Sequence, residues 1–469
     1  MAERILFLTG HLAEQRLRKM LAGMEDAGFE WEIVDIGVKV AALMTEPIIL
    51  RRLPRPVRAD RVIVPGRAGV DPERLAGAFG VAFERGPDEL VDLPRHLGRA
   101  GRAPDLSRYD IRIFAEIVDA PRLAPDALLC RARALRAEGA DVIDLGCKPG
   151  VAFPALENIV LRLKAEGMRV SVDSGDPAEL RRGAEAGADF LLSLTETTLD
   201  VAHGTAATPV LIPATPGDLD SLVRAATQAR ERNIPCLLDP ILEPIHFGFT
   251  ASLLRYAGLR ERLPDAEILM GTGNLTELTD ADSSGVTAVL MGVCSELAIR
   301  NVLVVQVSPH TRRTVAEHDA ARRMMYAARE NADLPRDYMA DLLQVHDRSP
   351  FTQSPAEIAA EAAELRDANF RIAAAEDGIH VFSSRMHATE REALKLYPAL
   401  GVEHDGAHAF YLGTELMKAE IALSLGKRYA QDEPLDWGSA APRTKRDVTR
   451  LAEAGHTLRA KRGSRADDP

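Results

Sequence analysis

The feature that most constrains the fold is a regular alternation of short apolar runs and helical segments between residues 111 and 308. Most intervals between the runs show helical periodicity, as in Asp126–Glu138, Pro177–Glu185 and Leu219–Arg232. Eight runs have the length and composition of buried strands: Ile111–Val118, Val142–Leu145, Val170–Asp173, Phe190–Leu194, Val210–Pro213, Cys236–Leu238, Ile268–Met270 and Val302–Val307. Eight strands that alternate with helices over about 200 residues are typical of a (β/α)8 TIM barrel.

An open, doubly wound parallel sheet is the competing α/β architecture. We favour the barrel because the strand count reaches eight and because polar residues collect where the strands end. In (β/α)8 barrels the functional groups lie at the C-terminal ends of the strands. These ends are therefore the positions to search for a site.

The flanking regions predict smaller domains. Residues 1–95 indicate a small parallel α/β domain with one clear helix, His11–Met24, and three strands: Ile5–Thr9, Trp31–Ile36 and Arg61–Pro65. Glycines and prolines among charges in residues 86–109 predict a linker or a surface excursion. The barrel domain is assigned to residues 96–345, and the segment His310–Ala332 is expected to complete it as a helix.

The C-terminal part predicts a separate small α+β domain over residues 346–440. It contains a strand-like run, Ile379–Phe382, and a helical segment, Glu415–Lys427. Residues 441–469 are polar and basic with almost no aromatic side chains, so we expect a disordered tail there.

Composition excludes several classes of protein. The net charge of −12 argues against a broad basic face and a nucleic-acid partner, although an anionic small molecule needs only local positive charge. No apolar run is long enough to cross a membrane and no signal pattern is visible, which favours the cytoplasm. The four cysteines form no CxxC pair, and Glu243, His246 and His310 match no metal-ligand spacing, so no protein-held metal is expected.

Three polar residues end predicted strands: Asp173, Asp239 and Asn274. A carboxylate at the end of a buried strand stays ionised only if N–H donors replace its lost water. A fused heterocycle with an amino group and a ring N–H offers such a donor pair. The alternative is an N-cap of the next helix, but Asp176 before Pro177 is the better cap, which leaves Asp173 for a ligand. For Asn274 the alternative is a turn.

Other strand ends add candidates. Ser193 could contribute a hydroxyl at the fourth strand, and Asp144 ends the second strand just before Gly146. Lys148 is either a cation at the barrel mouth or a solvated lysine on a tight turn. The eighth strand leads into a cluster that could bind an anion or simply begin a solvated helix, namely His310, Arg312 and Arg313.

The strand-end sequences Ala137–Gly146, Val170–Ser174 and Leu238–Pro240 resemble the pterin-binding barrel family. This family includes dihydropteroate synthase and the methyltetrahydrofolate:corrinoid methyltransferases, and the resemblance covers residues 111–315. It implies that Asp173 and Asp239 contact a pterin. Ser193 stands where the family usually has an asparagine.

Three motifs depart from the synthase. Gly273-Asn274-Leu275 replaces a Ser-Arg-Lys motif whose lysine contacts the pterin, and Gln306-Val307-Ser308 replaces Arg-x-His on the eighth strand. The first-strand loop of the synthase is replaced by Ile117–Pro121, which contains Asp119. The run Gly271–Asn274 instead resembles the methyltransferases, whose asparagine lies near the pterin N5. The resemblance therefore supports a pterin pocket more strongly than it supports either reaction.

Taken whole, the chain resembles divergent dihydropteroate synthase-like proteins found with tetrahydromethanopterin-type C1 metabolism. Its segment Ala409–Glu420 resembles a domain of unknown role that is attached to such proteins. The implied activity is a transferase that condenses a 6-hydroxymethyl-dihydropterin diphosphate with an arylamine in folate- or methanopterin-type cofactor synthesis. The substrate-binding residues would be Asp173, Asp239, Asn274, Ser193, Asp144 and Asp119. Mg²⁺ would arrive with the diphosphate, whose departure would be assisted by Lys148, His310, Arg312 and Arg313.

Two alternatives stay open. One is methyl transfer from a reduced methylpterin to a corrinoid held by another subunit, which Asn274 favours. The other is a non-catalytic pterin-binding or scaffold protein, which the missing lysine and arginine favour. The expected partners are a small-molecule pterin and an arylamine, with no nucleic acid and no membrane, and we allow for a homodimer.

Overall fold

The computed structural model describes residues 2–24, 28–88, 90–97, 105–336 and 338–442. Within them the chain forms two compact units. One comprises residues 105–344 and 437–442, and the other comprises the described residues of 1–104 together with 345–436. The predicted tail, from residue 443 onward, lies outside the described residues.

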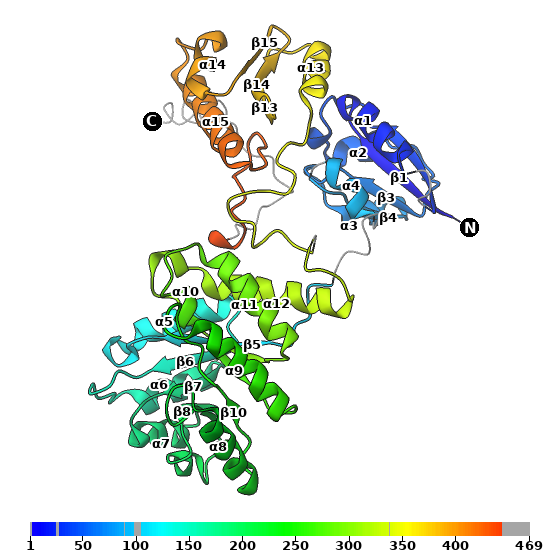
Figure 1. The fold of residues 1–469 in the computed structure, drawn as a ribbon. Helices are drawn as coiled ribbons and strands as arrows, with labels where there is room; N and C mark the ends of the chain where they lie inside the picture. The colour runs from blue at the N-terminus through cyan, green and yellow to red at the C-terminus, as the bar shows by residue number, and fades with distance from the viewer. Residues whose placement is uncertain (1, 25–27, 89, 98–104, 337, 443–469) are drawn as a thin grey trace, which may run out of the picture. The chain divides into compact units, whose positions relative to one another are not determined.

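Residues 105–344 contain the predicted eight-stranded sheet, and all its paired strands run parallel. Its strands are β5 (Arg112–Ile117), β6 (Val142–Gly146), β7 (Arg169–Asp173), β8 (Phe190–Leu194), β9 (Thr208–Leu211), β10 (Leu237–Leu238), β11 (Leu269–Gly271) and β12 (Asn301–Val304). Their order is β10-β9-β8-β7-β6-β5-β12-β11. A bridge between Leu238 and Ile268 joins the two edges of this sheet, with the Leu238 N–H 2.9 Å from the Glu267 carbonyl oxygen. The sheet is thus nearly closed, which confirms the barrel and excludes the open doubly wound sheet (Figure 1).

Helices follow most of the strands: α5 (Pro125–Ala137), α6 (Leu156–Ala165), α7 (Pro177–Glu185), α8 (Leu219–Glu231), α9 (Phe249–Arg262), α10 (Gly273–Thr276), α11 (Ser283–Glu296) and α12 (Thr314–Glu330). Asp176 caps α7, since its side chain accepts a hydrogen bond from the Ala178 N–H at 2.8 Å and Pro177 occupies the first helical position. Asp173 is therefore not the cap. The barrel core fills the space between strands and helices, and a smaller apolar cluster lies inside the sheet.

The N-terminal residues form a four-stranded parallel sheet of order β2-β1-β3-β4. Its strands are β1 (Glu3–Thr9), β2 (Phe29–Asp35), β3 (Arg61–Val64) and β4 (Ala82–Arg85). The helices are α1 (His11–Ala22), α2 (Glu46–Arg52), α3 (Pro72–Phe79) and α4 (Leu93–His96), with short 3-10 turns η1 (Ala41–Leu43) and η2 (Leu90–Asp92). The stretch after Gly86, predicted as a linker, thus carries η2 and α4 in its described part.

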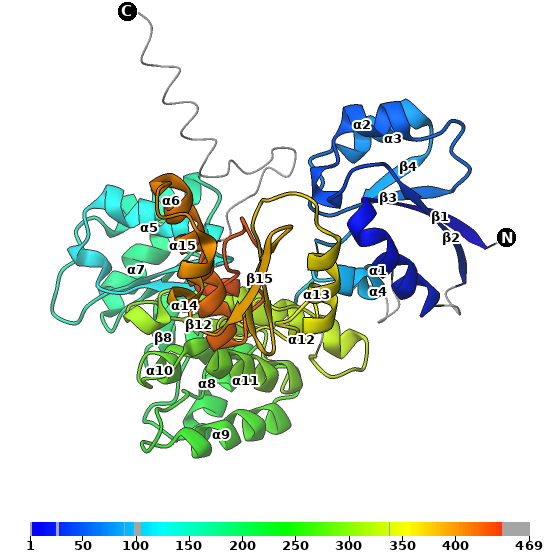
Figure 2. The ribbon, with the colours of Figure 1, turned by 90° about the horizontal axis from the view of Figure 1, so that it is seen from above.

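The C-terminal residues form a three-stranded antiparallel sheet. Its strands are β13 (Arg371–Ala375), β14 (Gly378–Ser383) and β15 (Met386–Glu390), and its helices are α13 (Pro355–Glu364), α14 (Ala393–Leu400) and α15 (Gly406–Leu425). Figures 1 and 2 show α14 and α15 on one side of this sheet and α13 on the other. Ile379 and Val381 pack toward α15, whereas Phe382 packs with Ile358 of α13. No helix among the described residues is long and apolar enough to span a bilayer.

Candidate active site

Four carboxylates come from the interior face of the barrel at the C-terminal ends of its strands. Successive side chains of a strand point to opposite faces, so residues two positions apart share a face. Phe114, Val142 and Leu237 belong to the apolar cluster inside the sheet. The residues two positions further along the same strands are Glu116, Asp144 and Asp239. Asp173 ends β7, next to Gly146 of β6 in the sheet.

Glu116, Asp144 and Asp173 form one electrostatically linked trio. Burial, and after it the nearby Asp173, raise the pKa of Glu116 from 4.5 to about 7. A Cβ atom on Gly146 would collide with the Glu116 carboxylate, so this glycine makes room for the acid.

Asp144 is the most deeply buried member of the trio, with no exposed surface. The Ser171 hydroxyl donates to Oδ1, while Oδ2 is buried without a hydrogen-bond partner. Burial, Asp173 and Glu116 all raise the pKa of Asp144 well above its usual value, and the Ser171 hydrogen bond offsets only part of this. An ionised carboxylate with one oxygen left without a donor is costly in such a place. The surroundings of Asp144 therefore favour its protonated form.

Asp173 lies closer to the barrel mouth. Burial raises the pKa of its carboxyl group, and a hydrogen bond from the Ser193 hydroxyl, 3.3 Å from Oδ1, lowers it again in part. Ser193 itself is exposed, at the bulged end of β8. Because the pKa of Glu116 is about 7, the trio carries less than three negative charges at neutral pH, and a protonated member can donate as well as accept hydrogen bonds.

Asp239 has a different environment. Its Oδ1 accepts a hydrogen bond from the Tyr256 hydroxyl at 2.7 Å and another from the Ile241 N–H at 2.8 Å. Burial raises the pKa of Asp239 to about 6, while these two hydrogen bonds oppose the rise. Asp239 is therefore mostly ionised at pH 7. Tyr256 lies on α9 and has no exposed surface, so its hydroxyl fixes the orientation of the Asp239 carboxylate.

The loop after Asp239 is held in an unusual conformation. Ile241 has a φ of 66°, in the left-handed region that β-branched residues rarely adopt. The Arg255 guanidinium donates to the Ile241 carbonyl at 3.0 Å and to a Glu243 carboxylate oxygen at 2.7 Å. The amide of the exposed Asn274 donates to the Leu242 carbonyl at 2.7 Å. Asn274 thus joins the end of β11 to the loop that follows Asp239.

The predicted cations are spread around the mouth, and two of them have acidic partners. The Lys148 ammonium lies 3.5 Å from Asp119, which also lies 3.5 Å from Arg122. The Arg313 guanidinium lies 2.7 Å from Glu138 and donates to the Ser439 carbonyl.

The other two cations lie beyond the end of β12. His310 Nε2 is 3.1 Å from the Thr276 carbonyl oxygen. Arg312 is exposed, and no ion pair found among the described residues includes it. Two of the four predicted cations thus have acidic partners, and no ion pair found among the described residues includes the other two.

Two cavities open at the strand ends. One, of about 630 Å³, lies between the ends of β5 and β12, and its wall includes Glu116, Asp119, Gln306 and Arg312. The other, of about 480 Å³, lies beyond β6 and β7, and its wall includes Lys148. Glu116 is thus both a member of the trio and part of the wall of the larger cavity.

Three site residues were not found from the sequence. Glu116 carried a usable signal, because it is an acid inside an apolar strand and shares a face with Phe114. Tyr256 and Arg255 carried none, since they lie on a helix well after Asp239 and only the folded chain brings them back to it.

Among the described residues, one group of three metal-ligating side chains is close enough to share an ion. It consists of His11, Glu14 and Asp35, in the N-terminal sheet domain. His11 and Asp35 are exposed. In the described part of the barrel, the residues thus offer no comparable group for Mg²⁺.

Comparison with known proteins connects the chain to pterin-binding proteins. A family of unknown function (DUF6513) matches residues 3–88, and the family PterinBD-DUF4346 matches residues 383–432. An uncharacterized protein of Methanocaldococcus jannaschii is 24% identical over 525 aligned positions, which cover 92% of this chain and 98% of that protein. Dihydropteroate synthase type-2 of Escherichia coli is 42% identical over 79 residues, which cover 15% of this chain and 29% of the synthase. The resemblance to divergent dihydropteroate synthase-like pterin-binding proteins is confirmed.

The match with the curated synthase spans less than a third of that enzyme's length. Among solved structures, the Yersinia pestis dihydropteroate synthase with a pterine-sulfa conjugate has a TM-score of 0.37 at 20% identity, covering 48% of this chain and 95% of that one. The Burkholderia cenocepacia dihydropteroate synthase complexed with 7,8-dihydropteroate has a TM-score of 0.38 at 20% identity, covering 48% and 93%. A likeness of this degree does not speak to the reaction.

Proposed function

We propose that the protein is a pterin-binding transferase that condenses a 6-hydroxymethyl-dihydropterin diphosphate with an arylamine in folate- or methanopterin-type cofactor synthesis. The observation that carries the proposal is the pairing of two kinds of carboxyl group at one barrel mouth. Asp239 has a pKa of about 6 and is fixed by Tyr256, while burial raises the pKa values of Glu116, Asp144 and Asp173.

A pterin fits this arrangement chemically. Its amino group and ring N–H are adjacent donors, and an ionised carboxylate is the strongest acceptor that a protein can offer them. Both hydrogen bonds within the protein go to Oδ1 of Asp239, so Oδ2 is outside them. In our proposal Asp239 receives the amino edge, and Asp173, with Ser193 and Asn274, receives the remainder of the ring. Burial favours the protonated form of Asp144, and that form limits the repulsion between neighbouring acids.

The larger cavity beside Glu116 is the proposed site of the arylamine. In the reaction the arylamine nitrogen forms a bond to the methylene carbon of the pterin, and the bond from that carbon to the diphosphate oxygen breaks. The nitrogen then loses a proton. Glu116, whose pKa is raised to about 7, is suited to accept this proton because general bases act best when their pKa is near the working pH.

The diphosphate is the demanding part of the proposal. Arg312 and His310 are the cations that we assign to it first, since Lys148 and Arg313 are engaged with Asp119 and Glu138. Mg²⁺ would enter with the diphosphate and neutralise its charge, because the described barrel residues offer no group of their own for the ion. Asp119 and Lys148 would contribute only if their ion pair opened.

Binding of 6-hydroxymethyl-7,8-dihydropterin, measured by calorimetry, tests the pterin site. We expect Asp239→Asn to weaken binding at least about tenfold, because the amide loses a charge-assisted acceptor worth about 1.5 kcal/mol or more. Asp265→Asn is the control, since Asp265 is exposed and precedes β11 at the opposite end of the barrel. If the Asp239→Asn variant bound the pterin as tightly as the wild type does, Asp239 would not be part of the pterin site.

Turnover separates the synthase from a protein that only binds. The diphosphate of the same pterin, 4-aminobenzoate and Mg²⁺ should yield dihydropteroate and free diphosphate. Pterin binding without turnover for any arylamine tested would favour the non-catalytic interpretation and would leave the pterin site intact.

Methyl transfer from a methyltetrahydropterin is the second candidate. Two observations favour it: Lys148 and Arg313 already have acidic partners, and this reaction needs no diphosphate site. Asn274 would then lie near the reacting nitrogen, as the resemblance implies. Transfer of the methyl group from methyltetrahydrofolate to added cob(I)alamin, which gives methylcobalamin and tetrahydrofolate, would replace the synthase proposal if the first assay released no diphosphate.

A further inference from the structure

The N-terminal sheet domain contains a cavity of about 210 Å³ that is separate from the carboxylates of the barrel. Its walls come from the ends of β1, β3 and β4 and from one face of α1. The cavity is open to solvent on one side, so a small molecule can reach it.

The cavity lies where parallel sheets of this kind bind ligands. In the order β2-β1-β3-β4, the chain leaves β1 toward one edge of the sheet and leaves β3 toward the other. The C-terminal ends of β1 and β3 therefore border a crevice at the point where the strand order reverses. Thr9 ends β1, and Pro65 follows β3 directly; both line the cavity.

The loops around this crevice are fixed before any ligand arrives. The Arg85 guanidinium donates to the carbonyls of Gly66, at 2.8 Å, and Ala68, at 2.6 Å, which holds the loop after β3. Gly66 packs so closely on the loop after β4 that a Cβ atom would lie 2.5 Å from the Pro87 carbonyl. A preformed site binds with a smaller loss of conformational freedom.

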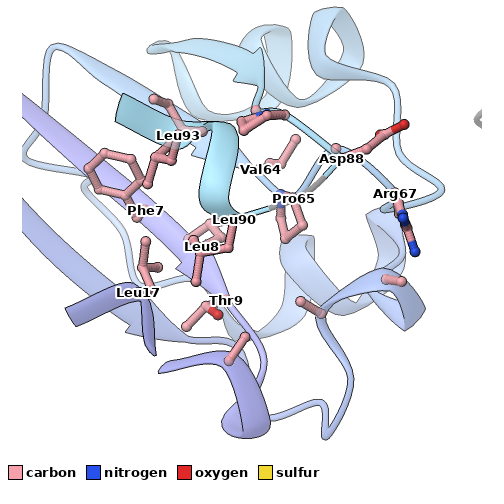
Figure 3. A pocket seen from close by; sticks show the side chains of 17 residues that line it. Phe7, Leu8, Thr9, Leu17, Val64, Pro65, Arg67, Asp88, Leu90 and Leu93 are labelled. Carbon is pink, nitrogen blue, oxygen red and sulfur yellow. The ribbon is translucent and has the colours of Figure 1, made fainter. Parts of the chain in front are cut away.

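The lining has one apolar end and one polar end. Figure 3 shows Phe7, Leu17 and Leu93 at one end, and Arg67 and Asp88 at the other. The three apolar side chains are buried, each with at most 5% of its surface exposed. Thr9 is also buried, and its hydroxyl donates a long hydrogen bond, 3.3 Å, to the Gly10 carbonyl.

The start of α1 argues against a phosphate as the main ligand group. Anions bind at helix N-termini through unused backbone N–H groups. Here the His11 and Leu12 N–H groups already donate to the carbonyls of Val38, at 2.8 Å, and Lys39, at 3.1 Å. The remaining walls are mostly carbon, which favours a ring.

We propose that this cavity binds a small planar aromatic molecule that carries one hydrogen-bonding edge. Its ring would lie among Phe7, Leu17 and Leu93, and its polar edge would point toward Thr9, Arg67 and Asp88. A cavity of about 150 Å³ lined by apolar side chains holds benzene. A volume of 210 Å³ therefore admits one ring or two fused rings. This site is independent of the proposed pterin transfer.

Titration of the full chain with indole tests the site. Ligand-observed NMR and calorimetry measure the binding. Indole has a fused ring and a single N–H edge, and we expect one molecule per chain with a dissociation constant of about 0.1 to 1 mM. Inorganic phosphate is the second probe. It should not bind at concentrations of about 0.1 to 1 mM, the range expected for the dissociation constant of indole. Saturable phosphate binding that displaces indole would overturn the assignment to an aromatic ring.

Variants that fill the cavity locate the binding. Ala13→Leu on α1 and Ala42→Leu in η1 add carbon from two different walls, and each should weaken indole binding at least about tenfold. Ala22→Leu is the matched control, since Ala22 is exposed on the same helix and does not line the cavity, and it should change affinity less than about twofold. Circular dichroism checks that each variant folds. If indole does not bind the wild type, or binds the folded filling variants equally well, the proposal is wrong.

Discussion

Replacing Glu116 by glutamine should stabilise the barrel at alkaline pH, because the folded barrel disfavours the ionised form of this acid. Its pKa is about 7 in the folded protein and 4.5 as the ordinary value. One pKa unit corresponds to about 1.4 kcal/mol, so ionised Glu116 lowers the free energy of unfolding by about 3 kcal/mol at pH 8. Relaxation and partial exposure reduce this to about 2 kcal/mol as a working expectation.

The sign follows from the protons bound in each state. Between pH 4.5 and 7 the folded state keeps a proton on Glu116 that the unfolded state has lost, so the free energy of unfolding falls as the pH rises. Below 4.5 both states are protonated and the effect vanishes. Glutamine resembles the protonated acid and does not titrate. Glu116→Gln should therefore exceed the wild type in stability by much more at pH 8 than at pH 5.

Urea unfolding at pH 5 and pH 8 measures this difference. The chain has two tryptophans, Trp31 in β2 and Trp437 in the barrel unit, so a Trp31→Phe background makes the remaining fluorescence report on the barrel. Glu261→Gln, at an exposed position of α9, is the control and should show no such pH dependence. A Glu116→Gln barrel that is less stable than the wild type at pH 8 would refute the reasoning.

Two further predictions concern Asp239 and its loop. Tyr256→Phe removes a hydrogen bond that lowers the pKa of Asp239, so this pKa should rise above about 6. Pterin affinity measured by calorimetry should therefore drop at pH 6.5 and recover at pH 8. An equal loss of affinity at both pH values would contradict this electrostatic role. Ile241→Gly should stabilise the barrel by about 1 kcal/mol in urea, because glycine adopts a φ of 66° without the steric penalty of a β-branched side chain; a destabilised variant would show that burial of the isoleucine side chain outweighs its backbone strain.

Much of the fold was predictable because burial imposes local patterns. The predicted strand Phe190–Leu194 and helix Pro177–Glu185 have these bounds in the structure, and the other barrel strands differ by a few residues at their ends. β4 was missed, since it has only four residues and is followed directly by Gly86 and Pro87. β13 was missed because it is rich in alanine, a weak strand former, and β15 because it is mostly exposed and carries few apolar residues.

The site was less predictable because its chemistry depends on pairs that are distant in the sequence. Strand alternation placed Asp173 and Asp239 at the barrel mouth. It did not indicate that Tyr256 would orient Asp239, or that Lys148 would meet Asp119. The cation cluster expected after the eighth strand was read from adjacency alone. Only the fold shows that Arg313 is engaged with Glu138.

A crystal structure of the protein with 6-hydroxymethyl-7,8-dihydropterin, grown near pH 7, tests the central claim most directly. The account predicts the amino edge of the pterin within about 3 Å of Asp239 and the ring within hydrogen-bond reach of Asp173. A pterin bound elsewhere in the chain, with water against both carboxylates, would contradict it.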